Sequence, residues 1–185
     1  MEQEELEVLL SSFSCSDDPD IEMFLRDRAV SFEKIHKSRT YLIMDEEQLI
    51  DDSLKVNDLV IYGYYSIALK VLYIPHDYSN TQRKELDGFN AKIHGEPITD
   101  ISCYLIGQLA RNSRVSKDEI PGSVILDMAY SVILEAVEAV GGRVIMIECH
   151  NNEKLISFYE SNGFTVISES PDNDIAMKQM IRIIK

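Results

Sequence analysis

The stretch over residues 148–164 reads ECHNNEKLISFYESNGF and contains the clearest succession of structural signals in the chain. Residues 152–159 have a short helical pattern, and the pair Asn162-Gly163 that follows is a typical helix stop. Residues 143–149 form an apolar run typical of a buried strand, and a second apolar run covers 164–167. The stretch therefore predicts a strand, a short helix and another strand. This order of elements is typical of folds in which helices pack on a sheet.

The residues before this stretch continue the pattern. An apolar run over 101–110 predicts a strand, and Gly122 opens a long helical pattern that ends at Gly141-Gly142. Further upstream, β-branched and aromatic runs over 40–44 and 59–72 predict two strands joined by an acidic insert. Residues 75–100 are largely polar and contain Gly and Pro, which predicts a loop with some helix.

The two ends of the chain complete the expected order of elements. Residues 6–13 are expected to form a first strand, and Ser16-Asp17-Asp18-Pro19 then gives N-cap residues and a helix-start proline. Apolar residues at helical spacing follow as far as Phe32, and residues 175–184 are expected to form a closing strand. We therefore expect an α/β (α+β mixed) fold: a mixed, mostly antiparallel sheet of six to seven strands with helices on both faces, in a single domain over 1–185.

Composition restricts the class of protein. The chain has 185 residues, 45% of them hydrophobic, and its 18 Lys+Arg against 32 Asp+Glu give a net charge of −14. This balance matches a globular protein and argues against disorder. It also argues against nucleic acid as a partner, because Lys and Arg supply most of the affinity for phosphates. The acidity is concentrated in residues 1–60, whereas Arg111, Arg114 and Lys117 lie within seven residues that contain no acid.

The three cysteines have no CxxC spacing, and the four histidines show no spacing typical of metal ligands. The first residues, MEQEELEVLL, lack the basic and long apolar regions of a signal peptide, and no apolar run approaches the about 20 residues that span a bilayer. We therefore expect a reduced, cytoplasmic protein that has no metal and no membrane partner.

Three segments together resemble the GNAT superfamily of acetyl-CoA-dependent N-acetyltransferases. They begin with Tyr104-Leu-Ile-Gly-Gln-Leu-Ala-Arg-Asn and Ile120-Pro-Gly-Ser-Val-Ile-Leu-Asp-Met-Ala, and end with the stretch quoted above. Earlier residues, such as Phe24-Leu-Arg-Asp-Arg-Ala and Ile61-Tyr-Gly-Tyr-Tyr-Ser-Ile-Ala, resemble the branch with bacterial toxin-like acetyltransferases. The resemblance implies a GNAT-type fold that uses acetyl-CoA as cosubstrate.

The loop before the long helix has the chemistry of an anion site, because free backbone N–H groups and the helix dipole both favour phosphate. In the superfamily the CoA pyrophosphate binds here, under a Gln/Arg-x-x-Gly-x-Gly/Ala signature. If Gly122 matches its last position, Lys117 stands at the Gln/Arg position and Ile120 replaces the usual glycine, with Glu119 beside the expected phosphates. The cofactor-binding residues implied by the resemblance are Leu109 and Arg111, through their backbones, and Lys117, Ile120, Pro121, Gly122, Ser123 and Asn152.

The resemblance also implies roles in catalysis. Asn152 would bind the pantetheine arm, and Tyr159, seven residues later, would protonate the departing CoA thiolate. A phenol suits this acid role because it is protonated at neutral pH. Glu148 is a candidate for the base that removes the ammonium proton of the acceptor, and Tyr104 is another.

We expect an N-acetyltransferase that moves an acetyl group to a primary amine by direct attack, with Tyr159 as general acid. From the net charge, the expected acceptor is a small-molecule or peptide amine. Two alternatives stay open: a toxin-type enzyme that acetylates aminoacyl-tRNA, and a non-catalytic module that binds CoA or a partner. A homodimer is also open, because GNAT relatives often dimerise.

Overall fold

The computed structural model describes residues 3–51, 53–169 and 177–185. The first two residues of the strand expected over 175–184 lie outside these ranges. The chain divides into two compact units, which are described separately below. The first unit comprises Met1–Ile67 and Gln108–Val132, and the second comprises Ala68–Gly107 and Ile133–Lys185. The single acetyltransferase domain expected over 1–185 stays a prediction.

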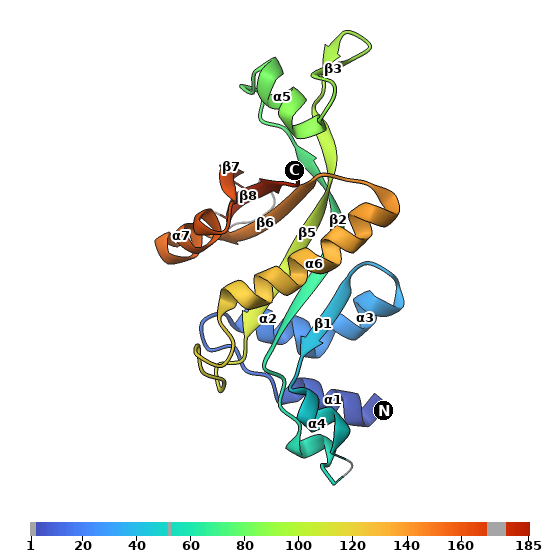
Figure 1. The fold of residues 1–185 in the computed structure, drawn as a ribbon, viewed down its shortest axis with the longest axis vertical. Coiled ribbons are helices and arrows are strands. Elements are labelled where there is room, and N and C mark those ends of the chain that lie inside the picture. Colours follow the sequence, from blue (N-terminus) through green and yellow to red (C-terminus); the bar gives the residue numbers. More distant parts are fainter. Residues whose placement is uncertain (1–2, 52, 170–176) are drawn as a thin grey trace. The chain divides into compact units, whose positions relative to one another are not determined.

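The described residues contain a six-stranded sheet with the order β1-β2-β5-β6-β8-β7. Strand β5 pairs with β6 in parallel, whereas β1 with β2, β6 with β8 and β7 with β8 are antiparallel. The strands are β1 (Arg39–Ile43), β2 (Gly63–Tyr73), β5 (Asp100–Arg111), β6 (Val144–His150), β7 (Thr165–Glu169) and β8 (Met177–Ile183) (Figure 1). The mixed, mostly antiparallel sheet with helices confirms the predicted fold class.

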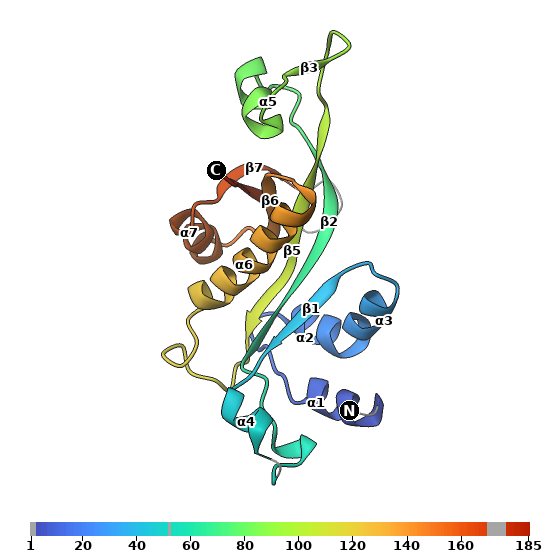
Figure 2. The same cartoon turned by 45° about the vertical axis from the view of Figure 1, so that its right-hand side comes forward.

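The strand predictions over 40–44, 59–72, 101–110, 143–149 and 164–167 are confirmed, with small shifts at the ends. The polar segment after β2 folds into helix α5 (Asn80–Asp87) and a two-stranded ladder of β3 (Lys92–Ile93) and β4 (Glu96–Pro97). The other helical segments are α1 (Gln3–Ser11), α2 (Pro19–Met23), η1 (Phe24–Arg28), α3 (Ala29–Lys34), α4 (Glu46–Ile50), η2 (Val56–Asp58), α6 (Gly122–Val140) and α7 (Glu153–Ser161) (Figure 2).

The strand expected over residues 6–13 is wrong, because this segment forms helix α1. Its large apolar residues recur at intervals of three and four, the period of a helix and not of a strand. They are Leu6, Leu9, Leu10 and Phe13, of which the last three are buried. Val8 is the only β-branched residue within α1, so strand propensity is also low.

The helix expected after Pro19 is confirmed, but it is not regular. Asp18 is its N-cap and accepts a hydrogen bond from the backbone N–H of Asp20, as the capping signal predicts. The helix then changes to a π-helical turn, η1, before it continues as α3. Leu25 on this turn is fully buried, which places the π-helical turn against the apolar core of the first unit.

Each unit has its own apolar core. The core of the first unit comprises Leu9, Leu10, Phe13, Cys15, Leu25, Ala29, Ile61, Tyr64 and Ala110. That of the second comprises Leu72, Ile74, Leu86, Ile98, Cys103, Val144, Met146 and Ile181. Within the described part of the chain, no helix is long and apolar enough to cross a bilayer.

Candidate functional site

The loop between β5 and α6, in the first unit, is held by its own polar groups. Ser116 accepts a hydrogen bond from the N–H of Asp118 through its hydroxyl, and its own N–H donates to the Glu119 carboxylate at 2.7 Å. These two hydrogen bonds, from different residues, stabilise a local turn between Ser116 and Glu119. Ile120 is 5% exposed, so its side chain anchors the end of the loop in the protein interior. The residue that replaces the usual glycine of the signature therefore has a packing role.

Several donors at this loop have no protein acceptor among the described residues. They are the backbone N–H groups of Lys117, Glu119, Gly122 and Ser123, which lie on the loop and on the first turn of α6. In the same unit, Arg111 Nε is buried and lacks a hydrogen-bond partner within the described ranges. Buried or convergent donors without acceptors favour an anion. The residues present therefore fit the diphosphate of CoA, although the exposed carboxylates of Asp118 and Glu119 oppose it electrostatically.

Leu109 and Arg111 lie near the end of β5, where the structure places both as half-buried residues. The parallel pairing of β5 with β6 covers Tyr104 to Ile106 against residues 145–147. Strand β5 continues for five residues after Ile106. Among the described residues, the pairing with β6 therefore ends before the backbone groups of Leu109 and Arg111. The role expected for these groups in binding CoA requires that they have no partner on β6.

Tyr159 lies on α7 in the second unit and is 8% exposed. Its ring contacts Phe158 and Phe164 edge to face, with centroids 5.0 and 5.7 Å away. Burial, with a smaller effect from Cys149, raises the pKa of the Tyr159 phenol above its ordinary value. The phenol therefore stays protonated throughout the physiological pH range, which an acid requires.

Asn152 is the N-cap of α7, and its side-chain Oδ1 accepts a hydrogen bond from the N–H of Lys154 at 2.9 Å. Its backbone is extended, so it lies before the first helical residue, Glu153. Asn152 is exposed, whereas Tyr159 is buried.

Glu148 lies on β6 of the second unit and is already hydrogen-bonded through both carboxylate oxygens. Lys70 Nζ donates to Oε2 at 2.7 Å, and Gln179 Nε2 donates to Oε1 at 2.9 Å. The Glu148 side chain is 17% exposed, so the ion pair is partly shielded from solvent. The ion pair and the hydrogen bond hold the Glu148 carboxylate in one position.

Tyr104, the other candidate base, is also engaged. Its hydroxyl donates to the backbone carbonyl of Gly141, and the residue is 5% exposed. Burial raises the pKa of this phenol, which disfavours the phenolate that would accept a proton. The structure thus gives Tyr104 a role in fixing the end of α6.

The predicted residues therefore fall into two groups. Leu109, Arg111 and the loop residues 117–123 lie in the first unit, and Glu148, Asn152 and Tyr159 lie in the second. No three His, Cys, Asp or Glu side chains among the described residues are grouped so that they could hold a metal ion.

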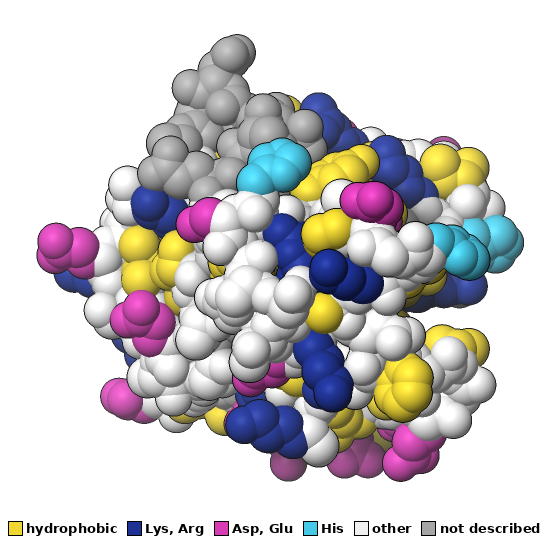
Figure 3. Space-filling model, turned by 90° about the horizontal axis from the view of Figure 1, so that it is seen from above, with side chains coloured by type: hydrophobic (Ala, Val, Ile, Leu, Met, Phe, Trp, Pro, Cys, Tyr) yellow, Lys and Arg dark blue, Asp and Glu magenta, His cyan; other side chains and the backbone are white. Residues whose placement is uncertain are grey.

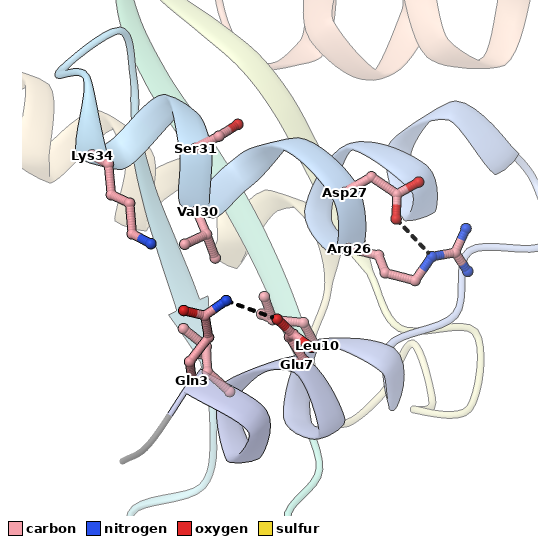
Figure 4. Close-up of a pocket in the computed structure, with 9 residues that line it drawn as sticks. Gln3, Glu7, Leu10, Arg26, Asp27, Val30, Ser31 and Lys34 are labelled. Atoms are coloured by element: carbon pink, nitrogen blue, oxygen red, sulfur yellow. Dashed lines mark hydrogen bonds and ion pairs between the residues drawn. The ribbon is translucent and has the colours of Figure 1, made fainter.

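A separate cavity of about 250 Å³ lies in the first unit between α1 and the segment η1–α3 (Figure 4). It contains none of the residues predicted from the sequence. Its apolar lining comes from Leu6, Leu10 and Val30, and its rim includes a hydrogen bond from Gln3 to Glu7 and an ion pair between Arg26 and Asp27.

The sequence prediction passed over a basic segment in residues 26–39. It contains five Lys and Arg against two acids, although the chain as a whole is strongly acidic. Lys and Arg side chains are also spread over the face of the molecule drawn in Figure 3. Arg26 is ion-paired with Glu22 and Asp27, and Arg39 with Glu33, so part of this positive charge is neutralised locally.

No family model matches the chain, and no curated protein matches it. Solved structures do. The structure of AtaT complexed with acetyl-methionyl-tRNAfMet aligns with a TM-score of 0.65 at 21% identity, over 91% of this chain and 85% of that chain. AtaTR bound with AcCoA aligns with a TM-score of 0.63 at 21% identity, over 92% and 86%. A tyrosine-to-phenylalanine mutant of KacT aligns with a TM-score of 0.65 at 20% identity, over 92% and 85%. At these identities the likeness establishes the fold, which is of the GNAT type found in these proteins.

One expectation must be corrected. The net charge argued for a small-molecule or peptide amine acceptor and against nucleic acid, but proteins of this fold occur in complexes with nucleic acid. Besides the complex with tRNA, the AtaT-AtaR complex bound to DNA aligns with a TM-score of 0.59 at 18% identity, over 94% of this chain and 85% of that chain. The physical reason is that phosphate binding depends on the local arrangement of cations and not on their sum.

Proposed function

We propose that this chain is a toxin-type acetyltransferase that moves the acetyl group of acetyl-CoA to the amino group of an aminoacyl-tRNA. The observation that carries the proposal is the likeness, over 91% of the chain, to AtaT in complex with an acetylated aminoacyl-tRNA. The likeness to AtaTR bound with AcCoA supports acetyl-CoA as the acetyl donor. These likenesses favour the toxin alternative over an enzyme for small-molecule amines.

The loop of the first unit would bind the CoA diphosphate. The free N–H groups of Lys117, Glu119, Gly122 and Ser123 supply donors, and the N-terminus of α6 adds a favourable dipole. Arg111 brings a buried donor without a protein partner. In this proposal Ile120 and Pro121 shape the loop, and neither side chain bonds to phosphate.

Strand β5 would bind the extended arm of CoA through its backbone. In the described part of the chain the pairing with β6 ends at Ile106. The peptide groups of Leu109 and Arg111 are therefore candidates to bond the pantetheine amides. A backbone N–H directed at the thioester oxygen would also stabilise negative charge on that oxygen. Asn152 is assigned to the same arm, through the part of its amide not used in capping α7.

Acetyl-CoA supplies an acetyl group activated as a thioester. In the proposal Tyr159 donates its phenolic proton to the departing sulfur, a step for which its raised pKa keeps the proton in place. Glu148 is proposed to accept the proton released by the attacking amine, directly or through water. Its ion pair with Lys70 and its hydrogen bond with Gln179 hold the carboxylate in position.

The test is acetyl transfer from labelled acetyl-CoA in the presence of a panel of aminoacyl-tRNAs, uncharged tRNA and small amines. We expect label only in acid-precipitable tRNA, and only when the tRNA is charged. Uncharged tRNA is the matched control, because it offers the same phosphates without the amino group. Binding of acetyl-CoA with no transfer to any charged tRNA would overturn the proposal and favour the non-catalytic module.

A further inference from the structure

Asn112 is the first residue after β5 and is completely buried. Its side-chain Nδ2 donates to the carbonyl of Ile61 at 2.8 Å, and its own N–H donates to the carbonyl of Tyr62 at 2.8 Å. Its Oδ1 accepts from the N–H of Arg114 at 3.0 Å, and its carbonyl accepts from the N–H of Val115 at 3.0 Å. Four hydrogen bonds therefore converge on one residue at the start of the loop.

We infer that Asn112 is the positioning residue of the cofactor loop: it fixes the loop before the cofactor binds, so that the free N–H groups farther along face the diphosphate. This inference rests on the proposed function, because it assigns that loop to CoA. Asn112 itself contacts no part of the cofactor in this account and acts only through the backbone.

Neither of the two side chains closest in size and shape satisfies both partners. Asp has no N–H for the Ile61 carbonyl and brings a charge into a dry site, whereas Leu has no acceptor for the Arg114 N–H. A buried polar group that loses its partner destabilises the folded state, so the loop would rearrange to reach water. The bonds to Ile61 and Tyr62 attach the loop to the chain just before β2, and those to Arg114 and Val115 set its direction.

A second attachment follows immediately. The N–H of Ser113 donates to the carbonyl of Ser14 at 2.8 Å, and its hydroxyl accepts from the N–H of Ser16 at 2.8 Å. Buried Val115 and Ile120 then fix the middle and the end of the loop. These residues therefore lose their conformational entropy when the protein folds and not when the cofactor binds. This is the physical basis of pre-organisation.

The second unit offers a matched control. Arg83 is 5% exposed and donates through its guanidinium to the carbonyls of Tyr78, Ile98, Pro75 and His76. It is also a buried polar residue that holds a loop, but this loop has no assigned part in binding acetyl-CoA. Replacement of Arg83 consequently measures the effect of lost stability alone.

The experiment compares Asn112→Ser and Asn112→Asp with Arg83→Met in the full chain, by calorimetric titration with CoA, steady-state kinetics and urea unfolding. We expect the Asn112 variants to raise the Kd for CoA and the KM for acetyl-CoA about tenfold, with kcat at saturation within about twofold of the parent. Arg83→Met is expected to lower stability by a similar amount without changing the Kd. Folded Asn112 variants with the parent's Kd would overturn the inference.

Hydrogen exchange of the unsubstituted chain tests the same point without a variant. In the absence of CoA we expect slow exchange at the amides of Arg114 and Val115, and protection of Lys117, Glu119, Gly122 and Ser123 only after CoA is added. Fast exchange at Arg114 and Val115 until CoA is added would contradict the inference, because the cofactor would then order the loop. If the unsubstituted chain did not bind CoA at all, the proposed function would fail instead, and the exchange of Arg114 and Val115 would still report the anchoring by Asn112.

Discussion

Lys70 on β2 forms an ion pair with Glu148 on β6, with 2.7 Å between Nζ and Oε2. Both side chains are partly buried, and the carboxylate also accepts a hydrogen bond from Gln179. The pair determines how Glu148 can act. It holds the carboxylate in one position, between Lys70 and Gln179.

Removal of Lys70 is therefore expected to lower activity. Lys70→Met leaves the partly buried Glu148 carboxylate without the cation that holds it in place, so kcat should fall. Lys84→Met, the same charge change at an exposed site, should leave kcat unchanged. If Glu148 is the base, Glu148→Gln should also lower kcat at least about tenfold. An unaltered kcat in both Lys70→Met and Glu148→Gln would remove Glu148 from the mechanism.

Replacement of Tyr159 by Phe tests the acid. The substitution keeps the ring contacts with Phe158 and Phe164 and deletes only the hydroxyl. We expect kcat to fall about 10²–10⁴-fold with the KM for acetyl-CoA and the thermal midpoint nearly unchanged. Tyr78→Phe, which removes a hydroxyl elsewhere, is the control. Turnover of Tyr159→Phe within a factor of three of the parent would exclude the acid role.

The Glu119 carboxylate is expected to weaken binding of the cofactor. It lies on the loop assigned to the diphosphate and accepts the N–H of Ser116. Glu119→Gln keeps an oxygen acceptor for that N–H and removes the negative charge. We expect the Kd for CoA to decrease about two- to fivefold at low ionic strength, and less at high salt. Asp127→Asn, an exposed carboxylate on α6, should have no comparable effect. Weaker binding of CoA to Glu119→Gln would contradict this prediction. It would show that the hydrogen bond from Ser116 to the Glu119 carboxylate affects CoA binding more than the negative charge does.

The cysteines are expected to be unreactive in the folded protein. Cys15, Cys103 and Cys149 are all buried, and burial raises the pKa of Cys103 from 9.0 to about 12. At pH 8 only about one Cys103 in 10⁴ would then be a thiolate. Ellman's reagent should detect no fast thiol in the native protein and three after unfolding in urea. Because the raised pKa favours the folded state only while the thiol is protonated, this contribution to stability should decline as the pH rises from about 9 toward 12. A fast stoichiometric reaction at pH 8 would refute this account.

Periodicity predicted most of the sheet, because runs such as 101–110 and 143–149 are apolar, bounded and long enough. The strand predicted over residues 6–13 is wrong, because Leu6, Leu9 and Leu10 follow the period of a helix. The π-helical turn at 24–28 was also missed. A π-helical turn contains one residue more than an α-helical turn, and apolar residues three or four positions apart are compatible with both.

The candidate site was predicted less completely than the fold. Local signals identified the anion-binding chemistry before α6, since it depends on neighbouring residues. The pairing of Lys70 with Glu148 could not be predicted, because 78 residues separate the two and the contact depends on strand order. The burial of Asn112 likewise depends on carbonyls of Ile61 and Tyr62, which no local pattern connects to it.

We propose that the acetyl group is transferred to the amino group of a charged tRNA. Mass spectrometry of the terminal aminoacyl-adenosine tests this transfer; the fragment is released by nuclease from an aminoacyl-tRNA after incubation with the chain and acetyl-CoA. We expect this fragment to gain the mass of one acetyl group, and we expect Tyr159→Phe to slow the gain greatly. An unchanged fragment across a complete set of aminoacyl-tRNAs, with CoA binding intact, would contradict it.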